Sequence, residues 1–120
     1  MHREIKFEFK IKTKAETLKR IYTLEEIARS KEVFMLLSNS EIMYSRQFSG
    51  IKDLNGNEIY EGDIVIPAKF KDIPNIVEYI GSGFYRTKKH GDRKYFNQLG
   101  SCQVLKIGDI FEGITDQKQN

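Results

Sequence analysis

Three carboxylates lie close together in the segment NGNEIYEGDIV (55–65): Glu58, Glu61 and Asp63. Glu61 and Asp63 are two positions apart with a glycine between them, so a turn can bring their carboxyl groups together. Such a pair can act as general acid and base, or bind a divalent cation with Asn57. The alternative is structural, with Asp63 accepting hydrogen bonds from backbone N–H groups where the chain enters the strand IVI. The spacing is not that of an EF-hand, so the structural interpretation is favoured.

One cysteine and two histidines are the other residues with catalytic potential. A cysteine–histidine nucleophile would need Cys102 beside His2 or His90. Because SCQVLKI reads as a buried strand and His2 is terminal, a packed thiol is expected instead. His90 and Asp92 in the loop KKHGDRK do not make a metal site by themselves. We therefore expect no catalytic residues, no metal and no cofactor; the alternative is a hydrolase or metal-dependent site at the carboxylate pair above.

The segment FYRTKKHGDRKYF (84–96) combines four aromatic residues with five Lys or Arg. Residues 67–97 carry seven Lys or Arg against three Asp or Glu, whereas residues 1–66 carry eleven of each, so the stretch accounts for the formal net charge of +3. Aromatic rings can stack on bases while cations meet phosphates. Alternatively, half of the aromatic rings point into the core and the lysines are simply solvated. The candidate nucleic-acid-binding residues are Tyr85, Arg86, Lys88, Lys89, Arg93, Lys94 and Tyr95.

The elements that position these residues are mostly strands. EIKFEFKIK (4–12) alternates apolar and charged residues with a period of two, which predicts a half-buried strand. Thr23 begins a capping box and predicts a short helix over about 24–30. EVFMLLS and EIMYSRQFS are predicted as two further strands, joined by a tight hairpin at Asn39-Ser40.

Glycine-containing turns divide the second half of the chain into short strands. Asn55-Gly56 is the strongest turn signal, a bend at the Gly-Asp pair precedes IVI, and Pro67 ends that strand. NIVEYI and FYRT form a predicted hairpin around GSG. CQVLKI and DIFEG complete the strands, and the tail TDQKQN is expected to fray.

Many short strands with glycine turns favour a small barrel or sandwich. We predict one mostly-β domain, in which residues 45–113 form a small SH3-like, partly open β-barrel. Residues 1–44 contribute the N-terminal strand, helix and strand that pack on it, and residues 114–120 are the tail. The length of 120 residues is sufficient for a core without disulfides. The predicted core residues are Phe7, Phe9, Leu24, Ile27, Ile64, Val65, Val77, Phe84, Val104 and Ile107.

The segment FSGIKDLNGNEIYEGDIV (48–65) resembles the central signature of the YopX family, small proteins of bacterial prophages and phages. REIKF (3–7), YTLEEI (22–27) and VLKIGDIFEG (104–113) are similar to other family segments, in the family order. Two features depart from the family pattern: the opening strand continues as EFKIK instead of an aromatic-acidic turn, and the closing segment has Gly-Asp in place of Gly-Asn. The resemblance implies a mostly-β fold with a small barrel and a phage or prophage origin. It implies no activity and no site residues.

The expected function is that of a non-enzymatic phage or prophage accessory protein. It is a binding module that acts through protein–protein contacts or self-association, since open edge strands can pair with a partner strand. The alternative is nucleic-acid binding through residues 84–96. No apolar run approaches the roughly 18 residues of a membrane span, and the N-terminus lacks the apolar core of a signal peptide. We therefore expect the cytoplasm of a bacterial host cell, with no membrane partner and no small-molecule substrate.

Overall fold

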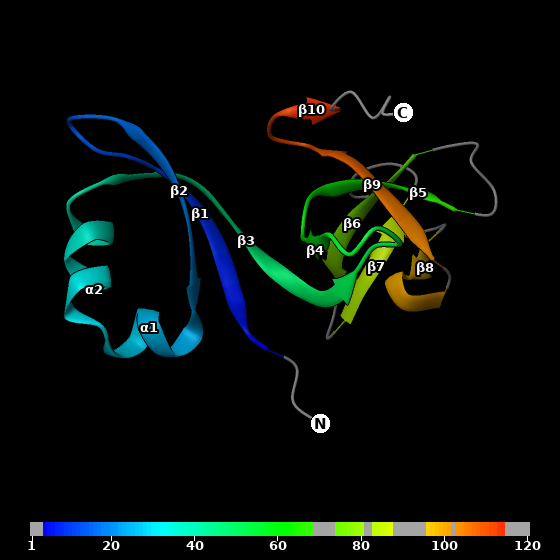
Figure 1. The fold of residues 1–120 in the computed structure, drawn as a ribbon, viewed down its shortest axis with the longest axis horizontal. Helices are drawn as coiled ribbons and strands as arrows, with labels where there is room; N and C mark the ends of the chain where they lie inside the picture. The colour runs from blue at the N-terminus through cyan, green and yellow to red at the C-terminus, as the bar shows by residue number, and fades with distance from the viewer. Residues whose placement is uncertain (1–3, 69–73, 81–82, 88–95, 102, 115–120) are drawn as a thin grey trace. The chain divides into compact units, whose positions relative to one another are not determined.

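The computed structural model describes residues 4–68, 74–80, 83–87, 96–101 and 103–114 (Figure 1). The chain forms two compact units, unit 1 (residues 1–50) and unit 2 (residues 51–120). Both are built on antiparallel strands, and the two short helices lie in unit 1, so the predicted mostly-β class is confirmed. The unit boundary falls within a strand, six residues after the predicted division at residue 44. The single-domain assignment stays a prediction.

Unit 1 is built on β2, β1 and β3, the first three strands of a four-stranded antiparallel sheet in the order β2-β1-β3-β4. β1 (Lys6–Lys12) is the strand predicted from the period-two alternation, and its Phe9 and Ile11 are buried. β2 (Thr17–Thr23) was not predicted, although it pairs with β1 along its whole length. β3 (Glu41–Lys52) confirms the strand EIMYSRQFS and continues into the start of unit 2.

The first helix, α1 (Leu24–Arg29), has the predicted capping box. The Thr23 hydroxyl accepts a hydrogen bond from Glu26 N (3.1 Å), and Glu26 Oε1 accepts one from Thr23 N (2.9 Å). The helix buries none of its residues. Leu24, which was predicted to be in the core, is 49% exposed because it lies in the first turn of this weakly buried helix.

The second helix, α2 (Lys31–Ser38), replaces a predicted strand. EVFMLLS was predicted as a strand and Asn39-Ser40 as a hairpin, and both predictions are wrong. Ser30 is the N-cap of α2, with its hydroxyl accepting from Val33 N (3.2 Å). Asn39 is the C-cap, and its side-chain amide donates to the Met35 carbonyl (2.9 Å). The Ser30 contact satisfies a backbone N–H in the first turn that a helix leaves without an intrahelical partner.

Unit 2 consists mainly of one antiparallel sheet in the order β10-β9-β5-β6-β7-β8. A five-residue turn, 53–57, also joins the end of β3 to β4. The predicted hairpin of NIVEYI and FYRT is confirmed as β6 and β7, and Pro67 ends β5 as predicted. The elements are β4 (Glu58–Tyr60), β5 (Asp63–Pro67), β6 (Asn75–Ile80), β7 (Gly83–Thr87), β8 (Phe96–Gln98), the 3-10 helix η1 (Leu99–Ser101), β9 (Val104–Asp109) and β10 (Gly113–Ile114).

The described strands do not close into a barrel, since the sheet of unit 2 ends at β10 on one side and at β8 on the other. The SH3-like, partly open barrel therefore stays a prediction. The predicted strand position of Cys102, the loop KKHGDRK and the tail TDQKQN lie outside the described residues.

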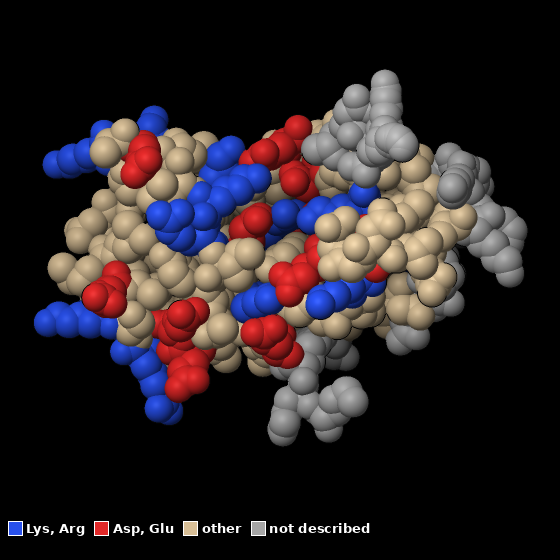
Figure 2. Space-filling model, viewed as in Figure 1, with Lys and Arg blue, Asp and Glu red and all other residues tan. Residues whose placement is uncertain are grey.

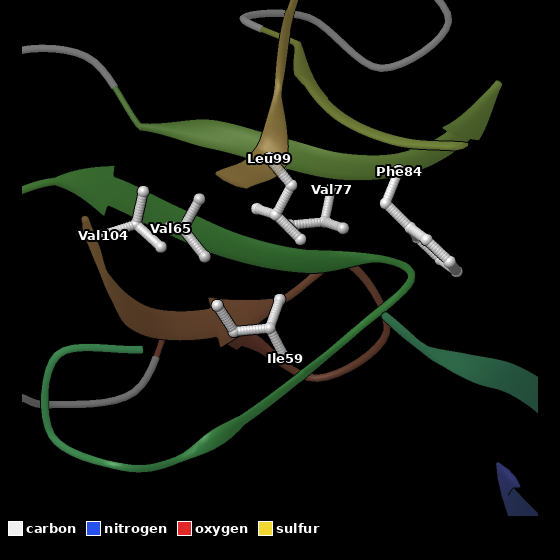
Figure 3. Close-up of a cluster of buried hydrophobic side chains, with 6 residues drawn as sticks. All are labelled: Ile59, Val65, Val77, Phe84, Leu99 and Val104. Atoms are coloured by element: carbon white, nitrogen blue, oxygen red, sulfur yellow. The ribbon is translucent and has the colours of Figure 1, made fainter. Parts of the chain in front are cut away.

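The core of unit 2 is a cluster of six buried apolar side chains (Figure 3). Four of them were predicted, whereas Ile59 and Leu99 were not, because each lies in an element of only three residues. Among the other predicted core residues, Phe9 is buried and Phe7, Ile27, Ile64 and Ile107 are half-buried. The cluster consists of Ile59, Val65, Val77, Phe84, Leu99 and Val104.

Candidate functional site

Two of the seven candidate nucleic-acid-binding residues lie within the described part of the chain, both on β7. Arg86 is only 8% exposed, and its guanidinium donates to Asn75 Oδ1 at 3.0 Å. It lies opposite the core residue Val77. Tyr85 is half-buried and, because side chains alternate along a strand, points to the other face of the sheet. Arg86 and Tyr85 therefore do not line one common surface of this sheet.

The other five candidates fall outside the described residues, as does the loop that carries them. They are Lys88, Lys89, Arg93, Lys94 and Tyr95. The possible partners of a catalytic cysteine, His2 and His90, lie outside the described residues as well.

The carboxylate of Asp63 has the structural role that was favoured. It is fully buried, and Oδ2 accepts a hydrogen bond from Tyr60 N at 2.7 Å, which closes the turn between β4 and β5. The same oxygen lies 3.2 Å from Lys106 Nζ on β9. The Lys106 side chain is 25% exposed, so water reaches the cation but not the carboxylate. Asp63 is thus held by a backbone donor from its own turn and by a cation from β9, a strand that is distant only in the sequence.

Lys106 lies at the centre of a small polar cluster, which we call the Asp63–Lys106 cluster: Glu58, Tyr60, Asp63 and Lys106. Lys106 Nζ also donates to the Glu58 carbonyl at 3.3 Å, and it lies 6.0 Å from the centre of the Tyr60 ring. The Tyr60 hydroxyl donates to Glu58 Oε1 at 3.1 Å. Tyrosine, lysine and carboxylates are acid–base groups. However, Asp63 and Tyr60 are almost inaccessible to a substrate, so the contacts of the cluster connect three strands.

Two more buried aspartates occupy turns of unit 2. Asp53 Oδ1 accepts from Asn55 N (2.9 Å) and Asn57 N (2.8 Å), while its Oδ2 accepts from Lys106 N (3.0 Å). Asp109 Oδ1 similarly accepts from two N–H groups of the turn that follows β9. Carboxylates that accept backbone N–H groups are typical of Asx turns. The conspicuous acidic residues of the central segment therefore organise turns, and Asp53 also fixes its turn to β9.

A shallow pocket of about 270 Å³ lies beside the Asp53 turn. Its polar side chains include Lys52 and Gln103, whereas the Asp53 carboxylate is already engaged by the backbone. Within the described ranges, no group of three His, Cys, Asp or Glu side chains is arranged to hold a metal ion. The pocket is lined by Ile51, Lys52, Asp53, Leu54, Gly100, Gln103 and Val104.

We expect Gly62→Ala to lower the free energy of unfolding by about 2 kcal/mol. Gly62 has a φ of +88°, which is unfavourable for alanine by roughly 1 kcal/mol. A Cβ there would also lie 3.0 Å from Phe111 Cε2 and 3.4 Å from Ile110 Cγ1. Gly56→Ala is the matched control, because Gly56 has a φ of +86° but no atom within 4 Å of the added Cβ. Urea titration measures both losses, and equal losses would contradict the contact with Phe111.

Unit 1 exposes several large apolar side chains. On α2, Phe34 is 62% exposed and Met35 is 49% exposed, whereas Val33 is buried. Two more exposed apolar side chains, Ile42 and Met43, lie near the start of β3, which follows α2 after a two-residue link. Large exposed apolar side chains can mark a protein contact, so α2 with Phe34 and Met35 is a candidate for one. The exposed apolar residues of unit 1 are Ile5, Ile21, Leu24, Phe34, Met35, Ile42 and Met43.

Comparison with protein-family models gives one match, to the family described as YopX protein, over residues 3–113. This range includes all four segments on which the resemblance was based. No curated protein and no solved structure matches the chain. In the part of the chain that the structure describes, no helix has the length and apolar character needed to cross a membrane.

Proposed function

The chain belongs to the YopX family, and from this premise we propose that it is a non-enzymatic phage or prophage accessory protein that acts by protein contact. Its partner is a second copy of itself, bound through α2. The observation that carries the proposal is the outward position of Phe34 and Met35 on a helix that directs its other apolar side chains inward. On this view unit 2, with its partly open SH3-like sheet, is the stable scaffold of the module.

The burial pattern of α2 supports a contact on its outer side. Val33, Leu36 and Leu37 are buried or half-buried and have the i, i+3, i+4 spacing of one helix face. Phe34 and Met35 lie away from that face. Burying one such side chain stabilises a complex by about 1.5–3 kcal/mol. A contact that covers both of them therefore provides a substantial driving force for association.

Four charged residues in α2 or close to it in the sequence support a second copy as the partner. Arg29 and Lys31 are balanced by Glu32 and Glu41, and all four are exposed. A surface with a large excess of one charge repels a copy of itself, whereas a balanced surface does not. Most soluble oligomers are symmetric homo-oligomers in which one patch contacts its own copy.

The absence of enzymatic activity is part of the same proposal. Asp63 and Tyr60, two of the acid–base residues of unit 2, are buried, and Asp63 is held in contacts that connect strands. The alternative function, binding of nucleic acid through residues 84–96, stays a prediction. The structure describes only the first part of that segment and β8 at its end.

We expect the wild-type chain to be a dimer at tens of micromolar concentration, and the double variant Phe34→Ser/Met35→Ser to be a monomer. Light scattering coupled to size-exclusion chromatography measures both masses. Leu54→Ser is the matched control, because Leu54 is 51% exposed but belongs to unit 2. A wild-type monomer at every concentration would contradict self-association. If Phe34 and Met35 were then needed to retain a different protein, the surface would be correct and the partner wrong.

A further inference from the structure

A second basic segment lies in unit 1, separate from residues 84–96. Residues 6–23, which form the β1–β2 hairpin, carry six Lys or Arg against two Glu. Residues 24–66 carry four against eight, so an average over residues 1–66 conceals the positive hairpin. Blue side chains gather over the region of β1 and β2 in the space-filling view (Figure 2). The hairpin alone carries a larger positive excess than the whole chain.

The strand register places two of these basic side chains and one tyrosine in one row on one face of the sheet. Lys10 of β1 lies opposite Lys19 of β2 on one side and opposite Tyr44 of β3 on the other. Residues directly opposite one another in antiparallel strands share a face, and neighbouring strands are about 4.8 Å apart. Lys19 is exposed, and Lys10 and Tyr44 are half-buried. We call this row of Lys19, Lys10 and Tyr44 the hairpin face.

The rows on either side of the hairpin face define its charge. In one of them Glu8 accepts from Arg46 Nε at 2.7 Å, so this carboxylate has its own buried cation. In the other, Lys12 lies opposite Glu41. Between these rows, Lys10 and Lys19 lie directly opposite one another and place two cations side by side on neighbouring strands.

We propose that the hairpin face binds single-stranded nucleic acid. Phosphates lie at Lys10 and Lys19, and a base stacks on the ring of Tyr44. Surfaces that bind single strands combine cations that follow the backbone with aromatic side chains on which the bases stack. A three-stranded sheet that presents both in one row has these elements. The surface is distinct from α2 and from residues 84–96, so it adds a second class of partner to the proposed protein contact.

Fluorescence anisotropy of the full chain with a labelled, mixed-sequence single-stranded DNA of roughly 20 nucleotides tests the proposal. We expect Lys10→Gln/Lys19→Gln to weaken binding about tenfold at low salt. The slope of log K against log salt concentration should also decrease by about 1.4, since each phosphate contact in a single strand contributes about 0.7. Tyr44→Leu should weaken binding at least about fivefold and leave the salt slope unchanged, because stacking releases no counterions.

The matched control is Arg29→Gln/Lys31→Gln, which removes the same charge from exposed positions on the helices of unit 1. Wild-type affinity in this control supports the hairpin face, and circular dichroism establishes that each variant is folded. The proposal is overturned if the control weakens binding as much as the hairpin variant, because the effect is then one of net charge. It is also overturned if only Lys88→Gln/Lys89→Gln abolishes binding, or if Tyr44→Leu has no effect on the affinity.

Discussion

Replacing Asp63 by alanine is expected to lower the free energy of unfolding by about 3 kcal/mol. The substitution leaves the buried Tyr60 N–H without its acceptor, which costs about 1–3 kcal/mol. It also removes the carboxylate 3.2 Å from Lys106 Nζ. Loss of one partner from a fully buried pair costs 3–5 kcal/mol, and the partial exposure of Lys106 reduces this contribution. Urea-induced unfolding followed by circular dichroism measures the total.

A double-mutant cycle separates the two contributions. In Asp63→Ala/Lys106→Met no cation is left without its carboxylate. The double variant should therefore lose less unfolding free energy than the sum of the losses in the two single variants. Glu61→Ala is the control, since Glu61 is on the same turn but only half-buried. Additive losses in the cycle would show that Lys106 contributes nothing through Asp63.

Replacing Ile59 by alanine should have a similarly large effect, also about 3 kcal/mol. Ile59 is fully buried on β4, within the apolar cluster of unit 2 (Figure 3). Removing most of such a side chain costs the transfer free energy of the lost atoms together with that of the cavity, typically 2–5 kcal/mol.

Ile114→Ala is the matched control for Ile59, because the same atoms are removed from a side chain that is 64% exposed. Its loss should stay within about 0.5 kcal/mol. The comparison uses the midpoint and slope of urea unfolding for both variants. A loss below 1 kcal/mol for Ile59→Ala would mean that β4 is not part of the cooperative core.

The difference between α2 and β3 shows where sequence patterns were sufficient. β3 was predicted as the strand EIMYSRQFS, although the hairpin expected before it at Asn39-Ser40 was wrong. In EVFMLLS five apolar residues follow one another, and a short continuous apolar run does not distinguish a strand from a helix. The decisive signals were Ser30 as an N-cap and the helical spacing of Val33, Leu36 and Leu37. β2 was missed because it is an edge strand with mostly exposed residues, so its sequence shows little alternation of apolar and polar residues.

The turn roles of the central acidic residues were predictable because a local pattern determines them. Gly62 directly precedes Asp63, and the backbone N–H that donates to Asp63 belongs to Tyr60, three residues earlier. Lys106 could not be identified in this way, because its contact with Asp63 arises from the pairing of β5 with β9. The hairpin face was missed for the same reason: Lys19, Lys10 and Tyr44 become neighbours only through strand register.

The connection of the Asp53 turn to β9 affects how the chain folds during synthesis. Asp53 accepts from the amide of Lys106, which is 53 positions later in the sequence. At 5–20 residues per second, a ribosome needs roughly 3–11 seconds to add those residues. The strand pairs of unit 1 are complete in sequence by residue 50, and the β6–β7 hairpin is local. Until β9 has been made, however, the edge of β5 that β9 will cover is exposed on the nascent chain.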